Sequence, residues 1–281
     1  MPQAHYLAYY EHLASPKVKV RAGGATLETV NDNYILEGCA YFGVAIPVRF
    51  PDGNRSPRCE PGFEDLFQMS DDAARVVGLC LDQRTPLKRV AAYIRQERDK
   101  DKPGSMIAIW QFPAGVAAFI SDKSVESVRL ALDHARNPQV PPCVLLALRW
   151  YDLSKNASTG ADRLVSLWVS LEALIGTERP QRELVTKTAQ HLAKAEYGLG
   201  LRSAQIRQAL GLDKMLAWRN KIMHEGVCPV PWPIVPGDPG QRDWPQILCD
   251  VVGEILRCQL SASLTGSLRR HIDAGLIMAA S

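Results

Sequence analysis

The spacing of apolar positions divides the chain into two parts with different periodicity. Up to about residue 121, strand-like and helix-like stretches alternate, whereas every periodic segment after that point has helical spacing. In the clearest segment, 161–176, apolar residues recur at intervals of three and four residues: Leu164, Leu167, Trp168, Leu171, Leu174 and Ile175. Such recurrence is typical of an amphipathic helix. The pattern therefore predicts an α+β protein, in which an N-terminal mixed α/β domain is followed by an all-α helical bundle.

In the first part, alternating or β-branched and aromatic stretches predict strands in the segments 17–21, 34–50 and 106–120. Two helices are predicted there. One covers 73–81 and is capped by Ser70 to Asp72, and the other covers 86–99, where Val90, Ala91 and Ile94 have helical spacing. We expect residues 1–122 to form a sensor or regulatory domain.

In the second part, helical periodicity and terminal signals predict helices over 123–136, 142–155, 161–176, 183–197, 203–210, 213–225 and 243–263. Asp213 is expected to cap the sixth of these helices and Gly226 to end it. Residues 123–281 are therefore expected to form one bundle. Trp232 lies in the proline-rich loop of 227–242, where packing on the bundle and stacking on RNA bases are the alternatives.

Composition limits the function without naming it. Lys and Arg total 33 against 30 Asp and Glu, and a net charge of +3 gives no broad positive surface for nucleic acid. No apolar run approaches the ~20 residues that a membrane span needs, and the N-terminus does not look like a signal peptide. The seven cysteines form no C-x-x-C pair. We expect a reduced, cytoplasmic protein with no metal site, no cofactor and no membrane partner.

The residues best suited to chemistry are Arg219, Asn220 and His224. On a helix, Asn220 and His224 share a face, whereas Arg219 lies about 140° from His224 at ~100° per residue. Either the long arginine side chain reaches round the helix or a partner chain completes the site. A histidine can move the proton of a ribose 2′-hydroxyl, and an arginine can hold phosphate oxygens. The set therefore suits RNA cleavage without a metal.

Spacing alone does not identify the motif, because Arg129 and His134 repeat it. The sequence around the first match is distinctive. The segments Leu148–Tyr151, Asp162–Thr177 and Trp218–Gly226 together resemble the HEPN superfamily, and most closely its Apea-like branch. HEPN domains have an arginine and a histidine separated by four to six residues, usually with a polar residue after the arginine, as Asn220 is here. The resemblance covers roughly residues 140–265.

This resemblance implies a HEPN-type helical bundle that forms a homodimer and brings two such motifs together at the interface. Active HEPN members are metal-independent endoribonucleases that leave a 2′,3′-cyclic phosphate and a 5′-hydroxyl. Many act in anti-phage defence, abortive infection or toxin–antitoxin systems, so an antitoxin or a phage-derived trigger is expected to act through the N-terminal domain. Arg219 would hold the phosphate, His224 would be the acid or base, and Asn220 would orient substrate or histidine. Glu225 separates His224 from Gly226, where the Apea-like pattern usually has glycine directly.

Glu172 falls within the apolar face of its predicted helix, where a carboxylate needs a partner. It either pairs with Arg219 or His224 and supports the site, or it pairs with another arginine of the bundle, or it reaches solvent at the edge. The alternative function is a catalytically inactive HEPN module that dimerises and senses a nucleotide or protein partner. A metal hydrolase is a third possibility, but the sequence lacks clustered His and carboxylate ligands.

Overall fold

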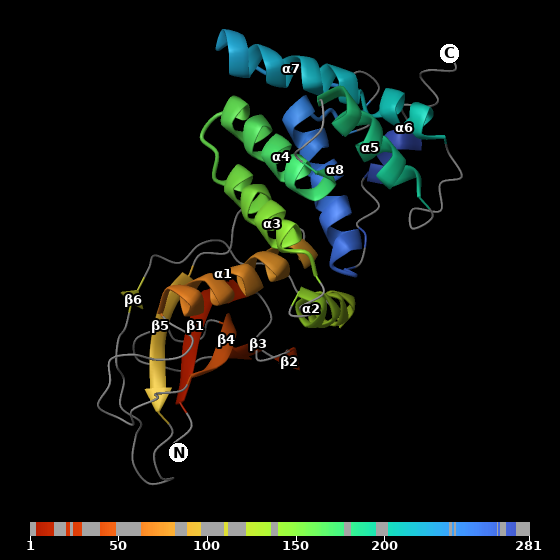
Figure 1. Ribbon diagram of the computed structural model, residues 1–281. Coiled ribbons are helices and arrows are strands. Elements are labelled where there is room, and N and C mark those ends of the chain that lie inside the picture. The colour runs from red at the N-terminus through yellow and green to blue at the C-terminus, as the bar shows by residue number, and fades with distance from the viewer. Residues whose placement is uncertain are drawn as a thin grey trace. The chain divides into compact units, whose positions relative to one another are not determined.

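The computed structural model describes residues 4–13, 21–22, 25–29, 40–48, 63–81, 89–96, 110–111, 122–135, 140–176, 181–194, 202–235, 238, 240–262, 264 and 268–273. Side chains are described in 64–81, in 126–135 and in the described residues from 140 onward. The chain divides into two compact units, residues 1–138 and residues 139–281 (Figure 1).

The first unit contains a six-stranded sheet in the order β2-β3-β4-β1-β5-β6, with every neighbouring pair antiparallel. The strands are β1 (Ala4–Leu13), β2 (Arg21–Ala22), β3 (Ala25–Thr29), β4 (Ala40–Val48), β5 (Arg89–Gln96) and β6 (Trp110–Gln111). Strand β1 lies between β4 and β5, and its Ala4 is opposite both Val48 and Gln96. The N-terminal segment is therefore hydrogen-bonded on both sides.

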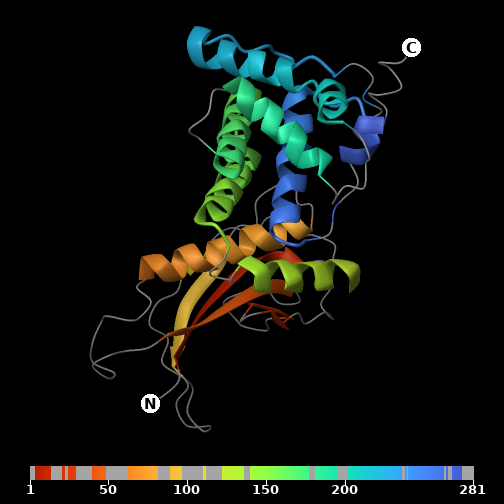
Figure 2. The ribbon, with the colours of Figure 1, turned by 45° about the vertical axis from the view of Figure 1, so that its right-hand side comes forward.

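Two helices accompany this sheet, α1 (Phe63–Cys80) and α2 (Asp122–Ala135). Helix α1 contacts β1, β4 and α2, and it crosses the sheet in Figure 2. The buried apolar side chains of the two helices include Leu66, Val76, Val77, Leu79, Val128, Ala131 and Leu132. Because α2 packs on α1, it belongs to the first unit. The boundary between the two units therefore falls after Pro138, whereas the sequence pattern predicts a domain boundary after residue 122.

Two predicted helices of the first unit need correction. The segment predicted as a helix over 86–99 contains β5, which pairs with β1 and β6. Its β-branched and aromatic residues suit a strand once neighbours are present, so sheet pairing overrides the helical spacing. The helix predicted over 73–81 begins at Phe63, and Ser70 lies inside it, donating its hydroxyl to the Phe67 carbonyl at 2.9 Å. Of the segments 17–21 and 106–120, only Arg21 and residues 110–111 are described.

The predicted fold class also needs correction. Wherever the structure describes side chains, the chain consists of helices and their connections, and those residues contain no strand apart from the isolated bridge between Ile234 and Asp243. For the six strands the structure gives backbone pairing but no side-chain packing. The described core is thus formed by helices that bury apolar stripes against one another. In the part of the chain whose side chains are described, the core is therefore helical, and the predicted mixed α/β class of the N-terminal domain does not describe it.

The second unit is a bundle of helices: α3 (Pro142–Lys155), α4 (Gly160–Ile175), α5 (Gln181–Ala193), α6 (Ser203–Ala209), α7 (Leu212–Glu225), α8 (Trp244–Gln259) and a short helix over 268–273. Helix α8 packs against α3 and α4, and α7 contacts α4, α5 and α6. Trp168, Leu148 and Leu164 are among the largest fully buried side chains. The helices predicted for this part are confirmed to within a few residues.

The ends of these helices follow local chemistry. Asp243 caps α8 by accepting a hydrogen bond from the Gln246 amide at 2.9 Å, as its position before the apolar run predicts. Gly226 ends α7 in the left-handed conformation, with φ of 66°. Asp213 does not cap α7, because the helix begins one residue earlier, after Gly211. Helix α8 ends at Gln259 rather than near residue 263.

Candidate functional site

Helix α7 carries the three residues of the predicted motif. The Oδ1 atom of Asn220 accepts a hydrogen bond from Nη1 of Arg219 at 3.2 Å. His224 lies one helical turn beyond Asn220 on the same face. Its side chain is exposed and makes no hydrogen bond or ion pair with any residue that the structure describes. The histidine is therefore open to a ligand or a partner chain.

Arg219 forms an ion pair with a residue of α4. Its Nη2 atom stands 3.8 Å from Oε1 of Glu172, and the exposed fractions of the two side chains are 19% and 18%. The same Glu172 oxygen accepts a hydrogen bond from Gln181 at 2.8 Å, and Gln181 in turn accepts one from the Trp168 indole at 2.7 Å. Of the arrangements considered for Glu172, the structure shows the pairing with Arg219. Helices α4, α5 and α7 thus fix the guanidinium together.

Arg219 and His224 are not brought together within one chain. Helical geometry separates them by about 140°, and Arg219 points to the side of α7 where Glu172 lies. No contact between Arg219 and His224 occurs among the described residues. The described chain therefore presents the two chemical groups of the motif on different sides of α7.

A pocket of about 430 Å³ opens on the face of α7 that contains Asn220. It is lined by Arg182, Arg207, Asp213, Leu216, Ala217 and Asn220. Arg207 donates two hydrogen bonds to Asp213, at 2.8 and 2.5 Å, and these bonds lower the pKa of the Asp213 carboxyl despite its partial burial. Arg207 also donates to the Thr186 hydroxyl at 2.9 Å. Sequence reasoning missed this pocket, because its two arginines come from separate helices and form no motif.

Aromatic residues flank α7 on another side. The rings of Trp218 and Trp232 meet edge to face, with centroids 5.6 Å apart. The ammonium of Lys221 stands 5.0 Å from the Trp218 ring centre. Gly160 at the start of α4 allows Trp232 to approach, because a Cβ there would lie 2.0 Å from its Nε1 atom. Of the two roles considered for this loop, the structure shows Trp232 packed on the bundle.

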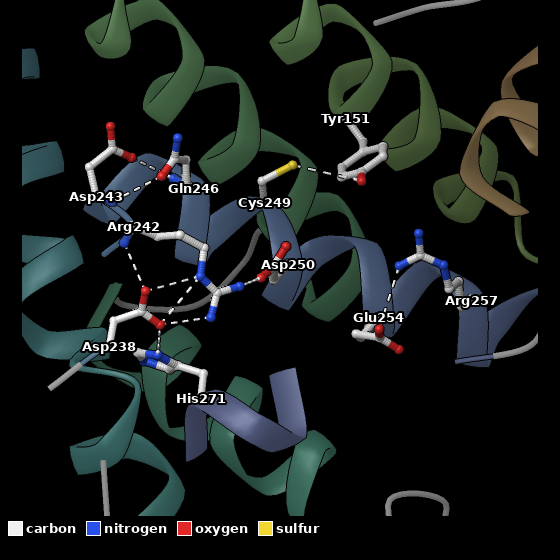
Figure 3. Close-up of polar contacts among 10 residues, drawn as sticks. All are labelled: Tyr151, Asp238, Arg242, Asp243, Gln246, Cys249, Asp250, Glu254, Arg257 and His271. Atoms are coloured by element: carbon white, nitrogen blue, oxygen red, sulfur yellow. Dashed lines mark hydrogen bonds and ion pairs between the residues drawn. The ribbon is translucent and has the colours of Figure 1, made fainter. Parts of the chain in front are cut away.

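A second polar cluster joins the loop before α8 to the last short helix (Figure 3). The Asp238 carboxylate accepts hydrogen bonds from the side chain and backbone of Arg242, both at 2.7 Å, and lies 2.7 Å from Nδ1 of His271. Burial alone would raise the pKa of Asp238, but the hydrogen bonds from Arg242 and His271 outweigh it and lower the pKa far below its usual range. Arg242 also pairs with Asp250. His271 is 1% exposed, so this cluster stabilises the fold rather than meeting a substrate.

Comparisons with known proteins assign no family: no family model, no curated protein and no solved structure matches the chain significantly. Among the described residues, no three His, Cys, Asp or Glu side chains lie close enough together to hold a metal ion. No helix in the described part of the chain is long and apolar enough to cross a membrane. The candidate site therefore consists of side chains of α7 and their neighbours.

Proposed function

We propose that this protein is a metal-independent endoribonuclease of the HEPN type. One observation supports the proposal above the others: Asn220 and His224 share an accessible face of α7 while Glu172 and Asn220 hold the Arg219 guanidinium. Arginine and histidine are side chains that suit phosphoryl transfer to a ribose hydroxyl without a metal, the first as a phosphate ligand and the second as an acid or base. The sequence resemblance to HEPN proteins supports the same assignment.

The proposed reaction is an internal transfer. His224 removes the proton of a ribose 2′-hydroxyl, the 2′-oxygen attacks the adjacent phosphorus, and the bond from phosphorus to the 5′-oxygen breaks. The leaving 5′-oxygen takes up a proton from a second acid. Arg219 binds the non-bridging oxygens and stabilises the charge that they gain in the transition state. The products are a 2′,3′-cyclic phosphate and a 5′-hydroxyl, so all atoms and protons are accounted for.

A second copy of the chain completes the proposed site. Because Arg219 and His224 lie about 140° apart on α7, the arginine of one protomer and the histidine of its partner would meet at a two-fold seam. Each of the two composite sites would then contain one arginine and one histidine, and solvent water would serve as the second acid that protonates the 5′-oxygen. By the same resemblance, the enzyme would act in the cytoplasm in anti-phage defence, abortive infection or a toxin–antitoxin system. Its antitoxin or phage-derived trigger would bind the N-terminal unit.

RNA cleavage in EDTA tests this proposal. Purified wild type should degrade mixed RNA and leave 2′,3′-cyclic ends, whereas His224→Ala and Arg219→Ala should not. His134→Ala is the matched control, because it alters the second arginine–histidine pair of the same spacing, on α2. A parallel growth assay in cells detects a nuclease that is inactive when purified. Equal cleavage by wild type and His224→Ala, or no activity of wild type in either assay, would overturn the assignment.

A second candidate function is a binding module without catalysis. It is favoured by one observation, that no described residue orients the His224 imidazole by a hydrogen bond, whereas catalytic histidines are usually held by a partner group. This candidate predicts that Arg219→Ala and His224→Ala alter dimerisation or ligand binding, while wild type neither cleaves RNA nor slows growth.

A further inference from the structure

The pocket beside Asn220 and the exposed His224 lie along a single face of α7. Asp213, Ala217, Asn220 and His224 are spaced at intervals of four, three and four residues, which keeps them within about 60° of one another on a helix. Asn220 lines the pocket, and His224 follows it by about 6 Å along the helix axis, at ~1.5 Å per residue. A ligand in the pocket therefore extends naturally towards the histidine.

The polar groups of the pocket differ in how far they are already engaged. Arg207 is occupied by Asp213 and Thr186, which fix its guanidinium in the wall. The Arg182 side chain is exposed, and its guanidinium makes no hydrogen bond or ion pair with a described residue, although its charge acts on Asp213. The Asn220 amide nitrogen likewise donates to no described residue, since only its oxygen is used, by Arg219.

These unused donors determine the chemistry of the ligand. A guanidinium and an amide N–H on residues that line one pocket match the non-bridging oxygens of a phosphate. Leu216 and Ala217 give the pocket an apolar wall on which a base or ribose can rest. The charges of Arg182, Arg207 and Asp213 sum to one positive charge. This net charge suits one phosphodiester group better than a highly charged polyphosphate.

We propose that the pocket formed by Arg182, Asn220 and the wall of α7 is a subsite for RNA, which binds the phosphodiester next to the scissile one. This inference rests on the proposed nuclease function, because it takes His224 as the position of the reacting ribose. The subsite holds the strand in register along α7, so that the 2′-hydroxyl reaches the imidazole. Arg182 is a binding residue in this arrangement and takes no part in the chemistry.

Binding of a fluorescent single-stranded RNA of ten nucleotides, measured by anisotropy in EDTA, tests the subsite. All proteins carry His224→Ala, which prevents cleavage. Adding Arg182→Gln should weaken binding about tenfold, as expected for a lost charged hydrogen bond. It should also reduce the slope of log binding constant against log salt concentration by about one. Ala217→Glu, which places a carboxylate in the pocket on a residue type that favours helix, should weaken binding at least as much. Arg270→Gln is the matched control, since it removes an exposed arginine that does not line the pocket.

The outcomes separate this inference from the nuclease proposal. If Arg182→Gln and Arg270→Gln weaken binding equally, or if the RNA does not bind at all, the subsite is wrong. If adenosine monophosphate competes as strongly per molecule as the RNA, the pocket is a mononucleotide site and the strand arrangement is wrong. The nuclease proposal is decided separately by cleavage with wild-type His224. A loss of RNA affinity in Arg182→Gln supports the subsite whether or not the wild type cleaves.

Discussion

The carboxylate of Glu172 on α4 stands 3.8 Å from the guanidinium of Arg219 on α7, and Gln181 at the start of α5 donates a hydrogen bond to the same carboxylate oxygen. A pairing of this kind limits the positions that the arginine can take, and catalysis is sensitive to misplacement of about 1 Å. Glu172 is therefore a positioning residue for the proposed site.

Replacing Glu172 by Gln should lower the rate of RNA cleavage about 10- to 100-fold, because the neutral amide holds Arg219 less firmly. The fall should appear in kcat with little change in KM, since the residue does not touch substrate. Glu126→Gln, which breaks an exposed ion pair with Arg129 on α2, is the control. A change confined to thermal stability, with kcat intact, would show that Glu172 has a structural role alone.

Mixing two inactive variants should restore cleavage. In a heterodimer of Arg219→Ala and His224→Ala, one of the two composite sites at the seam retains both an intact arginine and an intact histidine. After random exchange of subunits, about a quarter of the sites should be active by two-fold symmetry. Each variant alone supplies the baseline. If the mixture stays at that baseline although exchange is complete, the site is not shared between protomers in this way.

Gly160→Ala should weaken the attachment of the proline-rich loop. A Cβ at this position would lie 2.0 Å from the Trp232 indole nitrogen, so the ring must move away from Trp218. Alanine stabilises a helix by ~0.5–1 kcal/mol relative to glycine. The edge-to-face contact between Trp232 and Trp218 contributes a similar free energy, and displacing the Trp232 ring also exposes its apolar surface to water. Tryptophan fluorescence and urea unfolding should show an exposed indole and a net loss of stability.

A double-mutant comparison separates these opposing effects. In a Trp232→Ala background the steric conflict is absent, so Gly160→Ala should there be neutral or stabilising. If Gly160→Ala instead stabilises the protein that retains Trp232, then Trp232 does not occupy the described position.

The Asp238 cluster should make stability depend on acidity. The pKa of Asp238 is lower in the folded state than its ordinary value of 3.8, so its contribution is fully present above pH 3.8 and is lost as pH falls below it. Between pH 6 and pH 3 the wild type should lose about 1 kcal/mol from this group. Asp238→Asn should be about 2 kcal/mol less stable at pH 6, because it leaves Arg242 and His271 with a poorer partner. Its stability should also fall less steeply with acid.

Urea unfolding at both pH values provides this measurement. Asp273→Asn is the matched control, because Asp273 forms an exposed ion pair with Arg269 on the last short helix. An acid dependence that is the same in Asp238→Asn, Asp273→Asn and wild type would contradict the assignment to Asp238.

Much of the second unit was readable from the sequence because the relevant forces are local. Apolar residues at helical intervals, Asp243 before an apolar run and Gly226 after one locate α4, α7 and α8 without knowledge of their neighbours. The same regularity places Asn220 and His224 on one face and Arg219 on another. The sequence thus determined the local geometry of the candidate motif.

Only the tertiary structure determined those features that require contact between residues far apart in the sequence. The segment 89–96 has helical spacing but becomes a strand because β1 and β6 supply hydrogen bonds on both sides. Three further features join residues from separate helices or loops. They are the ion pair of Glu172 with Arg219, the pocket lined by Arg182 and Asn220, and the contact of Asp238 with His271. A sequence pattern fixes which way a residue faces on its own element, whereas a buried charge or a strand edge takes whichever partner the packing brings to it.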